Sequence, residues 1–197
     1  MECAPDTFGV NSQMTLLLAV PMFHANAWGM PYAAAMTGMK LVMPGPHMDG
    51  QSLYELMRDE KVGFSQAVPT IWLMLFQYFD AHPEIDTRAI GLKRIGVGGA
   101  ATPRSMIERF ERDFGADFVQ GWGMTETSPI GVIGNLLPKH LSMPKEAQMR
   151  VKMRHGRMPQ HLAASRTSLP IASNPRCIGW MAKGRLMMSD AITSPVN

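Results

Sequence analysis

One segment, Leu92 to Gly123, constrains the fold of this 197-residue chain more than any other. It reads LKRIGVGGAATPRSMIERFERDFGADFVQGWG, in which an apolar strand, a glycine turn, an amphipathic helix and a second strand follow one another. We expect Thr102 to cap the helix, Pro103 to occupy its first position and Gly115 to end it. Consecutive strands joined through a helix run parallel, so the segment predicts a βαβ unit and an α/β fold with a parallel sheet.

The residues before this unit continue the alternation of strands and helices. Short apolar runs predict strands, and the small-residue stretch WGMPYAAAMTG and two amphipathic stretches predict helices. The expected strands are Thr15 to Val20, Lys40 to Met43 and Phe64 to Val68, and two of the helices are Gln51 to Glu60 and the stretch opened by Pro69.

Composition excludes several classes of protein. Hydrophobic residues make up 46% of the chain, as in globular proteins, and no window approaches the ~18 apolar residues of a membrane span. The first residues, MECAPDTFGV, lack the basic start and the long apolar run of an export signal, so we expect a cytoplasmic protein without an integral membrane segment.

Cys3 and Cys177 match no metal-binding spacing, and we expect two unrelated reduced thiols.

Charge is distributed unevenly along the chain. Residues 1–144 carry 10 Lys and Arg against 14 Asp and Glu, a net charge of −4, whereas residues 145–197 carry 9 against 2, a net charge of +7. A basic tail can indicate a nucleic-acid-binding protein. This tail lacks interleaved aromatic residues and a compact basic helix, which makes that interpretation the least favoured.

The stretch QGWGMTETSP, which follows the second strand of the βαβ unit, has the composition of a binding site. Gly121 and Gly123 permit close approach of a ligand, Trp122 offers a flat face for a base, and the Thr125 hydroxyl can donate to a phosphate oxygen. Glu126 can bind Mg²⁺, which prefers carboxylate and phosphate oxygens. The structural alternative is that Thr125 caps a helix, Glu126 is a solvated acid in its first turn and Trp122 belongs to the core.

A second glycine turn, Gly98-Gly99-Ala100-Ala101, lies one βαβ unit earlier. Taken alone it is only a tight turn, because the chain contains neither a GxGxxG nor a Walker A pattern. Both glycine turns follow parallel strands, and ligands of such sheets bind beyond the carboxyl ends of the strands. We therefore expect the two turns to face one site.

The stretch PMFHANAWGMPYAA supplies a third set of candidate residues. His24 follows the end of an expected strand and could face a polar substrate group, and Trp28 could line or close an apolar channel. The alternative is a hydrogen-bonded structural histidine and a core tryptophan.

In this order and at about this spacing, the stretches VPMFHANAWGMPYAAAMTG, LVMPGPHMDGQSL, VPTIWLMLFQY, VGGAATPRSMIERFERDFG and QGWGMTETSP resemble the acyl-adenylate-forming, or AMP-binding, enzymes. The resemblance is strongest to the medium- and long-chain fatty-acid:CoA ligases and extends from about residue 3 to about residue 157. GWGMTE together with PMFHxNAW is a highly specific pair. We therefore expect a partial AMP-binding domain over residues 1–157 and an irregular basic tail over residues 158–197.

The resemblance implies an ATP-dependent reaction in two steps. A fatty-acid carboxylate attacks the α-phosphate of ATP to give an acyl-adenylate and pyrophosphate, and the acyl group then passes to the thiol of CoA. It also implies roles for individual residues. Trp122 stacks on adenine, Thr125 contacts the α-phosphate and Glu126 binds Mg²⁺, while His24 and Trp28 border the acyl site, Trp28 as the gate of a tunnel. The residues around ATP or AMP are Gly98, Gly99, Ala100, Ala101, Gln120, Gly121, Trp122, Gly123, Met124 and Thr125.

The sequence also departs from the family pattern. The family's Ser/Thr/Gly-rich phosphate loop, its ribose-binding Asp and the C-terminal domain with a catalytic Lys have no counterpart among the 197 residues. The resemblance to the family ends where the excess of positive charge begins, and we interpret the tail as degenerate or frame-shifted sequence.

We expect a fragment of a fatty-acid:CoA ligase that is inactive as written. The alternative is a non-catalytic remnant that binds acyl chains or nucleotide, and the full-length family also allows a homodimer.

Overall fold

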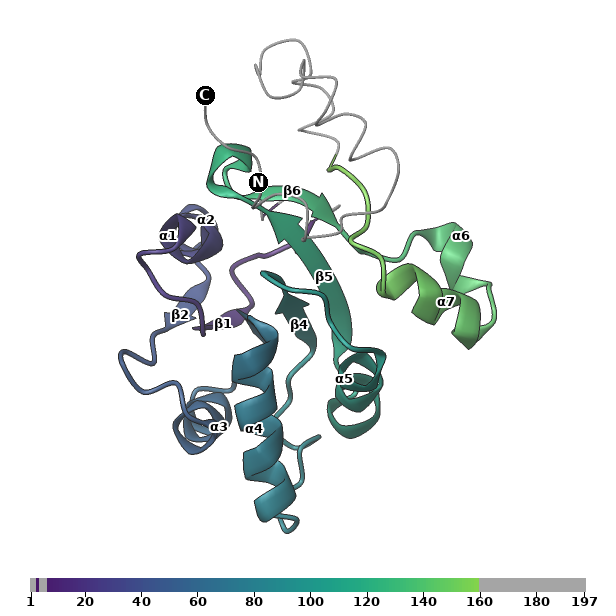
Figure 1. Ribbon diagram of the computed structural model, residues 1–197. Coiled ribbons are helices and arrows are strands. Elements are labelled where there is room, and N and C mark those ends of the chain that lie inside the picture. Colours follow the sequence, from purple (N-terminus) through teal and green to yellow (C-terminus); the bar gives the residue numbers. More distant parts are fainter. Residues whose placement is uncertain (1–2, 4–6, 160–197) are drawn as a thin grey trace, which may run out of the picture. The chain divides into compact units, whose positions relative to one another are not determined.

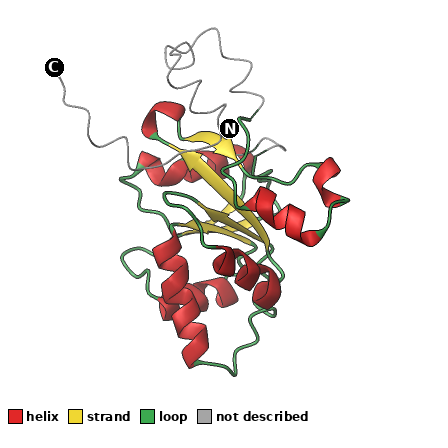
Figure 2. Ribbon diagram, turned by 45° about the vertical axis from the view of Figure 1, so that its right-hand side comes forward, coloured by secondary structure: helices red, strands yellow, loops and turns green. Residues whose placement is uncertain are grey.

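The computed structural model describes residue 3 and residues 7–159, and it confirms an α/β fold in which helices cover both faces of a six-stranded sheet (Figures 1 and 2). Residues 160–197, with nearly all of the expected basic tail, lie outside the described residues. The strands are β1 (Thr15–Leu18), β2 (Lys40–Val42), β3 (Phe64–Ala67), β4 (Arg94–Val97), β5 (Asp117–Gly123) and β6 (Ile130–Ile133). The helices are α1 (Ala25–Trp28), α2 (Met30–Thr37), α3 (Gly50–Asp59), α4 (Pro69–Ala81), α5 (Arg104–Arg109), η1 (Phe110–Phe114), η2 (Thr125–Thr127), α6 (Pro138–Leu141) and α7 (Lys145–Lys152).

The strand order in the sheet is β2-β1-β3-β4-β5-β6. The first five strands pair in parallel, as the sequence predicts, and β6 pairs antiparallel with β5. The chain runs outward from β1 to β2 and then returns past β1 to β3. The strand order therefore reverses between β1 and β3, which is where open α/β sheets bind ligands beyond the carboxyl ends of their strands.

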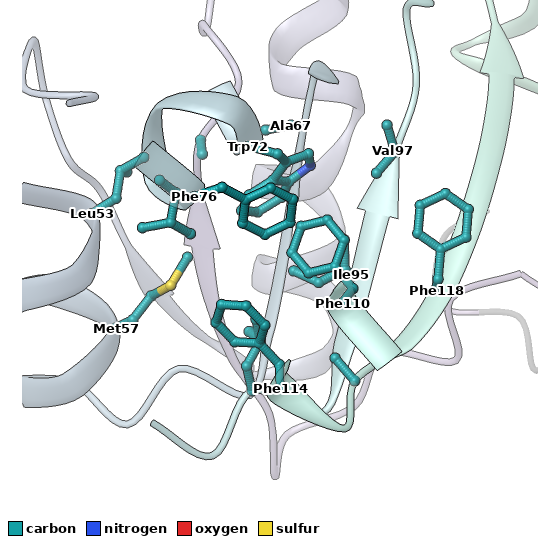
Figure 3. Close-up of a cluster of buried hydrophobic side chains, with 14 of the residues drawn as sticks. Leu53, Met57, Ala67, Trp72, Phe76, Ile95, Val97, Phe110, Phe114 and Phe118 are labelled. Atoms are coloured by element: carbon teal, nitrogen blue, oxygen red, sulfur yellow. The ribbon is translucent and has the colours of Figure 1, made fainter. Parts of the chain in front are cut away.

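The larger hydrophobic core lies under α3, α4, α5 and η1 (Figure 3). Trp72 of α4 meets Phe110 of η1 edge to face, with ring centroids 5.3 Å apart. Ile95 and Val97 point into this core from β4, because alternate residues of a strand share one face. This packing fixes β4 and β5, whose carboxyl ends carry both glycine turns.

The second core lies on the opposite face of the sheet, under α1, α2 and the segment that contains Phe8. Leu16, Leu18 and Phe64 point to this face, and the Phe8 and Phe64 rings lie 5.3 Å apart. Nη1 of Arg94 donates to the Phe8 carbonyl oxygen at 2.7 Å, which ties that segment to β4. No described helix is long and apolar enough to cross a membrane.

The boundaries of the βαβ helix differ from the prediction at one end. Gly115 ends the helical segment with φ 65°, as expected for a left-handed C-terminal glycine. Thr102 was predicted as the N-cap, and this is wrong: Pro103 is the N-cap with an extended backbone at ψ 143°, and α5 begins at Arg104. Thr102 is instead buried, and its Oγ1 has no hydrogen-bond partner among the described residues.

Candidate active site

A cavity of about 70 Å³ lies at the carboxyl ends of β3, β4 and β5, and the segment that follows β1 contributes His24, Ala25 and Trp28 to its lining. It therefore forms where the strand order favours a ligand site. All three segments singled out in the sequence contribute to its lining: the PMFHANAWGMPYAA stretch, the Gly98 to Ala101 turn and the QGWGMTETSP stretch. The predicted site residues that line the cavity are His24, Trp28, Gly98, Gly99, Gly121, Trp122, Gly123, Met124 and Thr125.

Four other predicted residues do not line the cavity. Ala100 and Ala101 are exposed on the turn that leads to α5, and Glu126 is exposed next to Thr125. Gln120 is 1% exposed, and its Nε2 lies 3.2 Å from Nδ1 of His155. Nε2 of Gln120 is thus engaged with His155 and its backbone carbonyl oxygen accepts from the amide of Gly134 at 2.7 Å, whereas its buried Oε1 has no hydrogen-bond partner among the described residues.

The turn at Gly98 and Gly99 leaves little room for side chains. A Cβ on Gly98 would lie 3.2 Å from Cη2 of Trp28 and 3.2 Å from the carbonyl oxygen of Gly121. Gly99 has φ +79°, and a Cβ there would lie 3.0 Å from Cγ1 of Val68. The turn therefore leaves room for a flat ring against the backbone, and in this structure the ring that lies there is the indole of Trp28.

Trp28 ends a turn of unusual backbone conformation. The segment labelled α1 is a single left-handed turn, because Ala25, Asn26, Ala27 and Trp28 all have φ between 45° and 55°. Left-handed helical geometry costs roughly 1–2 kcal/mol for each residue with a side chain. The amide of Gly29 closes the turn by donating to the carbonyl oxygens of Ala25 and Asn26 at 3.2 and 3.1 Å. Such strain is typical of functional segments that the surrounding fold holds in place.

Trp122 lies on the last part of β5 and rests on β6. A Cβ on Gly131 would lie 2.7 Å from Cζ3 of the Trp122 ring, so the glycine lets the indole pack on the strand. A Cβ on Gly123 would lie 1.8 Å from the carbonyl oxygen of Pro129, so no other residue fits at position 123. Strand β6 therefore supports Trp122 and the GWG turn, although the sequence analysis did not predict this strand.

Thr127, rather than Thr125, organises the short helix η2. The amide of Met124 donates to Oγ1 of Thr127 at 3.0 Å, and that hydroxyl lies 2.6 Å from the carbonyl oxygen of Pro129. The side chains of Thr125 and Glu126 have no hydrogen bond or ion pair within the described part of the chain. The hydroxyl and the carboxylate are therefore free to bind a ligand, which the capping interpretation of Thr125 did not allow.

The charge around the cavity is low. None of the described residues that line it is Lys or Arg, and Glu126 lies next to Thr125 of its lining. Within residues 7–159 and residue 3, no group of three or more His, Cys, Asp and Glu side chains is placed to hold a metal ion. A magnesium ion that arrives with phosphate oxygens needs only one or two protein carboxylates, so Glu126 fits such an ion.

Several residues that line the cavity were not predicted from the sequence. Phe8, Ala25, Gln66, Pro129 and Ile130 line the cavity together with the predicted residues. Of these, Gln66 alone carried a signal in the sequence, because a glutamine within the buried strand FSQA is a polar group where an apolar one is expected.

Comparison with known proteins places the whole described region in one family. The family model described as AMP-binding enzyme matches residues 1–160. The chain is 41% identical over 155 residues to a medium-chain-fatty-acid–CoA ligase of Ectopseudomonas oleovorans and 44% identical over 152 residues to a long-chain-fatty-acid–CoA ligase of Thermus thermophilus. These matches cover 79% and 77% of this chain but only 28% and 27% of the two ligases.

A solved structure agrees with this placement. The N-terminal domain of FACL13 from Mycobacterium tuberculosis matches with a TM-score of 0.61 and 28% sequence identity, over 76% of this chain and 34% of that domain. The chain thus spans about a quarter to a third of the proteins that it matches.

Proposed function

This chain belongs to the AMP-binding enzymes, and we propose that its cavity is the adenine and acyl part of a fatty-acid:CoA ligase active site. The observation that carries the proposal is the meeting of the two glycine turns with Trp28 at the carboxyl ends of the parallel strands. Trp28 and Trp122 offer aromatic surface on this apolar site, and Thr125 and Glu126 offer unpartnered oxygens beside it.

The nucleotide lies against the glycine turns in this proposal. Trp122, held by Gly131, stacks on adenine, and the backbone of Gly98 to Ala101 and of Gln120 to Met124 surrounds the nucleotide. The free hydroxyl of Thr125 donates to an α-phosphate oxygen. Base stacking on an aromatic side chain contributes about 1–3 kcal/mol, so Trp122 supplies a substantial part of the affinity.

Glu126 is the proposed ligand of Mg²⁺, which enters with the phosphates of ATP. The ion, when bound, neutralises charge on the phosphates, and positioning and electrostatics supply most of the catalysis in phosphoryl transfer. The chain's own contribution is to hold the carboxylate of Glu126 next to Thr125 through the short helix η2, which the Thr127 hydroxyl stabilises.

The fatty acid enters past Trp28, with His24 beside its carboxylate. The cavity of about 70 Å³ is much smaller than the ~300 Å³ or more of an ordinary small-molecule site, so an acyl ligand has to displace the Trp28 ring from Gly98. Trp28 then acts as the gate of the acyl channel. Each methylene that enters contributes about 0.8 kcal/mol, which favours chains of some length.

In the family reaction a carboxylate oxygen attacks the α-phosphorus of ATP, and the bond to pyrophosphate breaks. The thiol of CoA then attacks the acyl carbonyl of the adenylate, a thioester forms and AMP leaves. We place only the adenine, α-phosphate and acyl contacts on the described residues. The described residues that line the cavity include no Lys or Arg, and they therefore offer the β- and γ-phosphates no cationic partner. We therefore infer that the described residues by themselves bind ligands without completing the reaction.

Two measurements on the purified 197-residue chain test this function. Titration with AMP should change the tryptophan fluorescence, because two tryptophans line the cavity. Incubation with fatty acid, ATP, Mg²⁺ and CoA should release no pyrophosphate above the background. An unchanged spectrum at saturating AMP contradicts the nucleotide site, and clear fatty-acid-dependent pyrophosphate release contradicts the proposed lack of turnover.

A further inference from the structure

Gln66 of β3 is a buried polar side chain without a partner. It is 1% exposed and lines the cavity, and neither its Oε1 nor its Nε2 has a hydrogen-bond partner among residue 3 and residues 7–159. A buried amide left unpaired costs about 1–3 kcal/mol, so native proteins seldom tolerate one without a reason.

The surroundings of Gln66 are apolar. Leu18 is its neighbour on β1 and Gly96 its neighbour on β4, and Phe64 shares its face of β3. Phe8 closes over the same place: a Cβ on Gly96 would lie 3.2 Å from Cε1 of Phe8 and 3.4 Å from Oε1 of Gln66. No side chain within the described residues is therefore placed to satisfy the amide.

Gly96 makes room for this amide. A Cβ on Gly96 would lie 2.9 Å from Cβ of Gln66, closer than ordinary Cβ contacts allow. Any larger residue at position 96 would displace the Gln66 side chain. The glycine on β4 and the glutamine on β3 thus form a matched pair that keeps an amide at the base of the cavity.

The amide lies on the acyl side of the site. Gln66 points to the same face of the sheet as Leu18 and Phe8, beneath α1, which carries Trp28. Once the Trp28 ring moves away, a chain that enters from His24 meets the amide inside an otherwise apolar site. A plain alkyl chain leaves the amide unpaired, whereas a hydroxyl or keto oxygen on the chain pairs with it.

We propose that Gln66 is a specificity-determining residue that favours acyl substrates with a hydroxyl or keto oxygen along the chain over plain alkyl chains of the same length. This inference rests on the acyl-binding function proposed above. Sites that hydrogen-bond a substrate group discriminate strongly against analogues that lack it, because their own polar groups are then left unpaired.

The test measures the binding of two matched series of carboxylic acids to the 197-residue chain by calorimetry. One series consists of ω-hydroxyalkanoates of increasing length, and in the other a methyl group replaces the hydroxyl. At the length where the hydroxyl reaches Gln66, the hydroxy acid should bind about tenfold more tightly than its methyl counterpart. In Gln66→Leu this preference should disappear while the plain alkanoates bind at least as well as before.

A control variant separates this role from a structural one. Ser65→Ala changes the adjacent residue of the same strand, which is equally buried but points to the opposite face and donates to the Leu17 carbonyl oxygen at 2.9 Å. Ser65→Ala should lower the melting temperature and keep the preference. Gln66→Leu should lose the preference without a lower melting temperature, because it removes an unpaired polar group.

The possible outcomes separate the inference from the proposed function. If AMP and alkanoates bind but no hydroxy acid is preferred, or if Gln66→Leu keeps the preference, the inference is wrong and the function stands. If Gln66→Leu weakens AMP by the same factor as the hydroxy acids, the amide binds the nucleotide instead, which also overturns the inference. If neither AMP nor any acid binds the native chain, the inference and the proposed function both fail.

Discussion

The indole ring of Trp28 lies over the backbone of Gly98, so close that a Cβ on Gly98 would be 3.2 Å from its Cη2 atom. This contact joins the segment that follows β1 to the glycine turn that follows β4. It also places the proposed gate directly on the proposed nucleotide turn. Displacement of one ring therefore opens both parts of the site.

Gly98→Ala should destabilise the chain and loosen Trp28. The added methyl group meets the indole and also the carbonyl oxygen of Gly121, which belongs to the backbone and cannot rotate away. Overpacking of this kind costs about 1–3 kcal/mol of the free energy of unfolding, measurable by urea denaturation. A free energy of unfolding equal to that of the native chain would show that the contact is not as close as described.

Trp28→Ala should speed the entry of fatty acids. If the closed position of the ring dominates, with the open form at 10% or less, removal of the ring should raise the apparent association rate about tenfold or more. Stopped-flow mixing with a fluorescent fatty acid measures this rate. Tyr32→Ala, which removes an exposed ring of α2 outside the cavity lining, should leave the rate unchanged. Equal rates for native chain and Trp28→Ala would argue against a gate.

Ala25→Gly should be neutral or stabilising, although alanine-to-glycine changes in ordinary helices destabilise. Ala25 has φ 45°, a conformation that glycine adopts without strain. Ala35 is an exposed residue of the helix α2, and Ala35→Gly should lower the free energy of unfolding by about 1 kcal/mol. Equal losses in the two variants, measured by urea denaturation, would contradict the left-handed turn.

Protonation of His155 should weaken the fold below neutral pH. Burial lowers the pKa of the imidazole, and Nδ1 accepts a hydrogen bond from Nε2 of Gln120 in the neutral form. The unfolded chain therefore binds the proton more readily, so stability is complete above the ordinary pKa of about 6.5 and falls as the pH drops below it. Carboxyl groups with lowered pKa values, such as Asp49, titrate at lower pH.

The variant His155→Gln isolates this contribution, because a glutamine oxygen can still accept the hydrogen bond from Gln120. Urea denaturation from about pH 8 to about pH 5.5 should give a flatter dependence for His155→Gln than for the native chain. Identical slopes would mean that His155 titrates alike in the folded and unfolded chain.

The sequence predicted the parallel part of the fold because its signals were local. Apolar runs identified β1 to β5, and Gly115 marked the end of a helix through its left-handed conformation. The prediction that Thr102 caps the helix was wrong, because a threonine before a proline has the sequence of a cap whether the proline is the first helical residue or still precedes the helix. Strand β6, Ile130–Ile133, was missed because only the short helix η2 precedes it, whereas a longer helical segment precedes each of β2 to β5. Its antiparallel pairing with β5 defines it.

The site, like the fold, could be predicted where the signal was local in the sequence and not where contacts between distant residues decide the structure. The glycine turns and Trp28 were found from motifs, and the structure places them around one cavity. The left-handed turn was not predictable, because Ala25 to Trp28 contain no glycine and the conformation is imposed by tertiary packing. The importance of Gln66 emerged only when the structure showed that no neighbour pairs with its amide.

In the proposed function, one cavity binds the adenine and the acyl group together. The most direct measurement is calorimetric titration with a non-hydrolysable acyl-sulfamoyl-adenosine, which carries both groups, on the native chain, Trp122→Ala and the control Tyr32→Ala. We predict one binding site on the native chain and on the control, and about tenfold or greater weakening in Trp122→Ala. Absence of binding to the folded native chain, or equal affinity in Trp122→Ala, would contradict the claim.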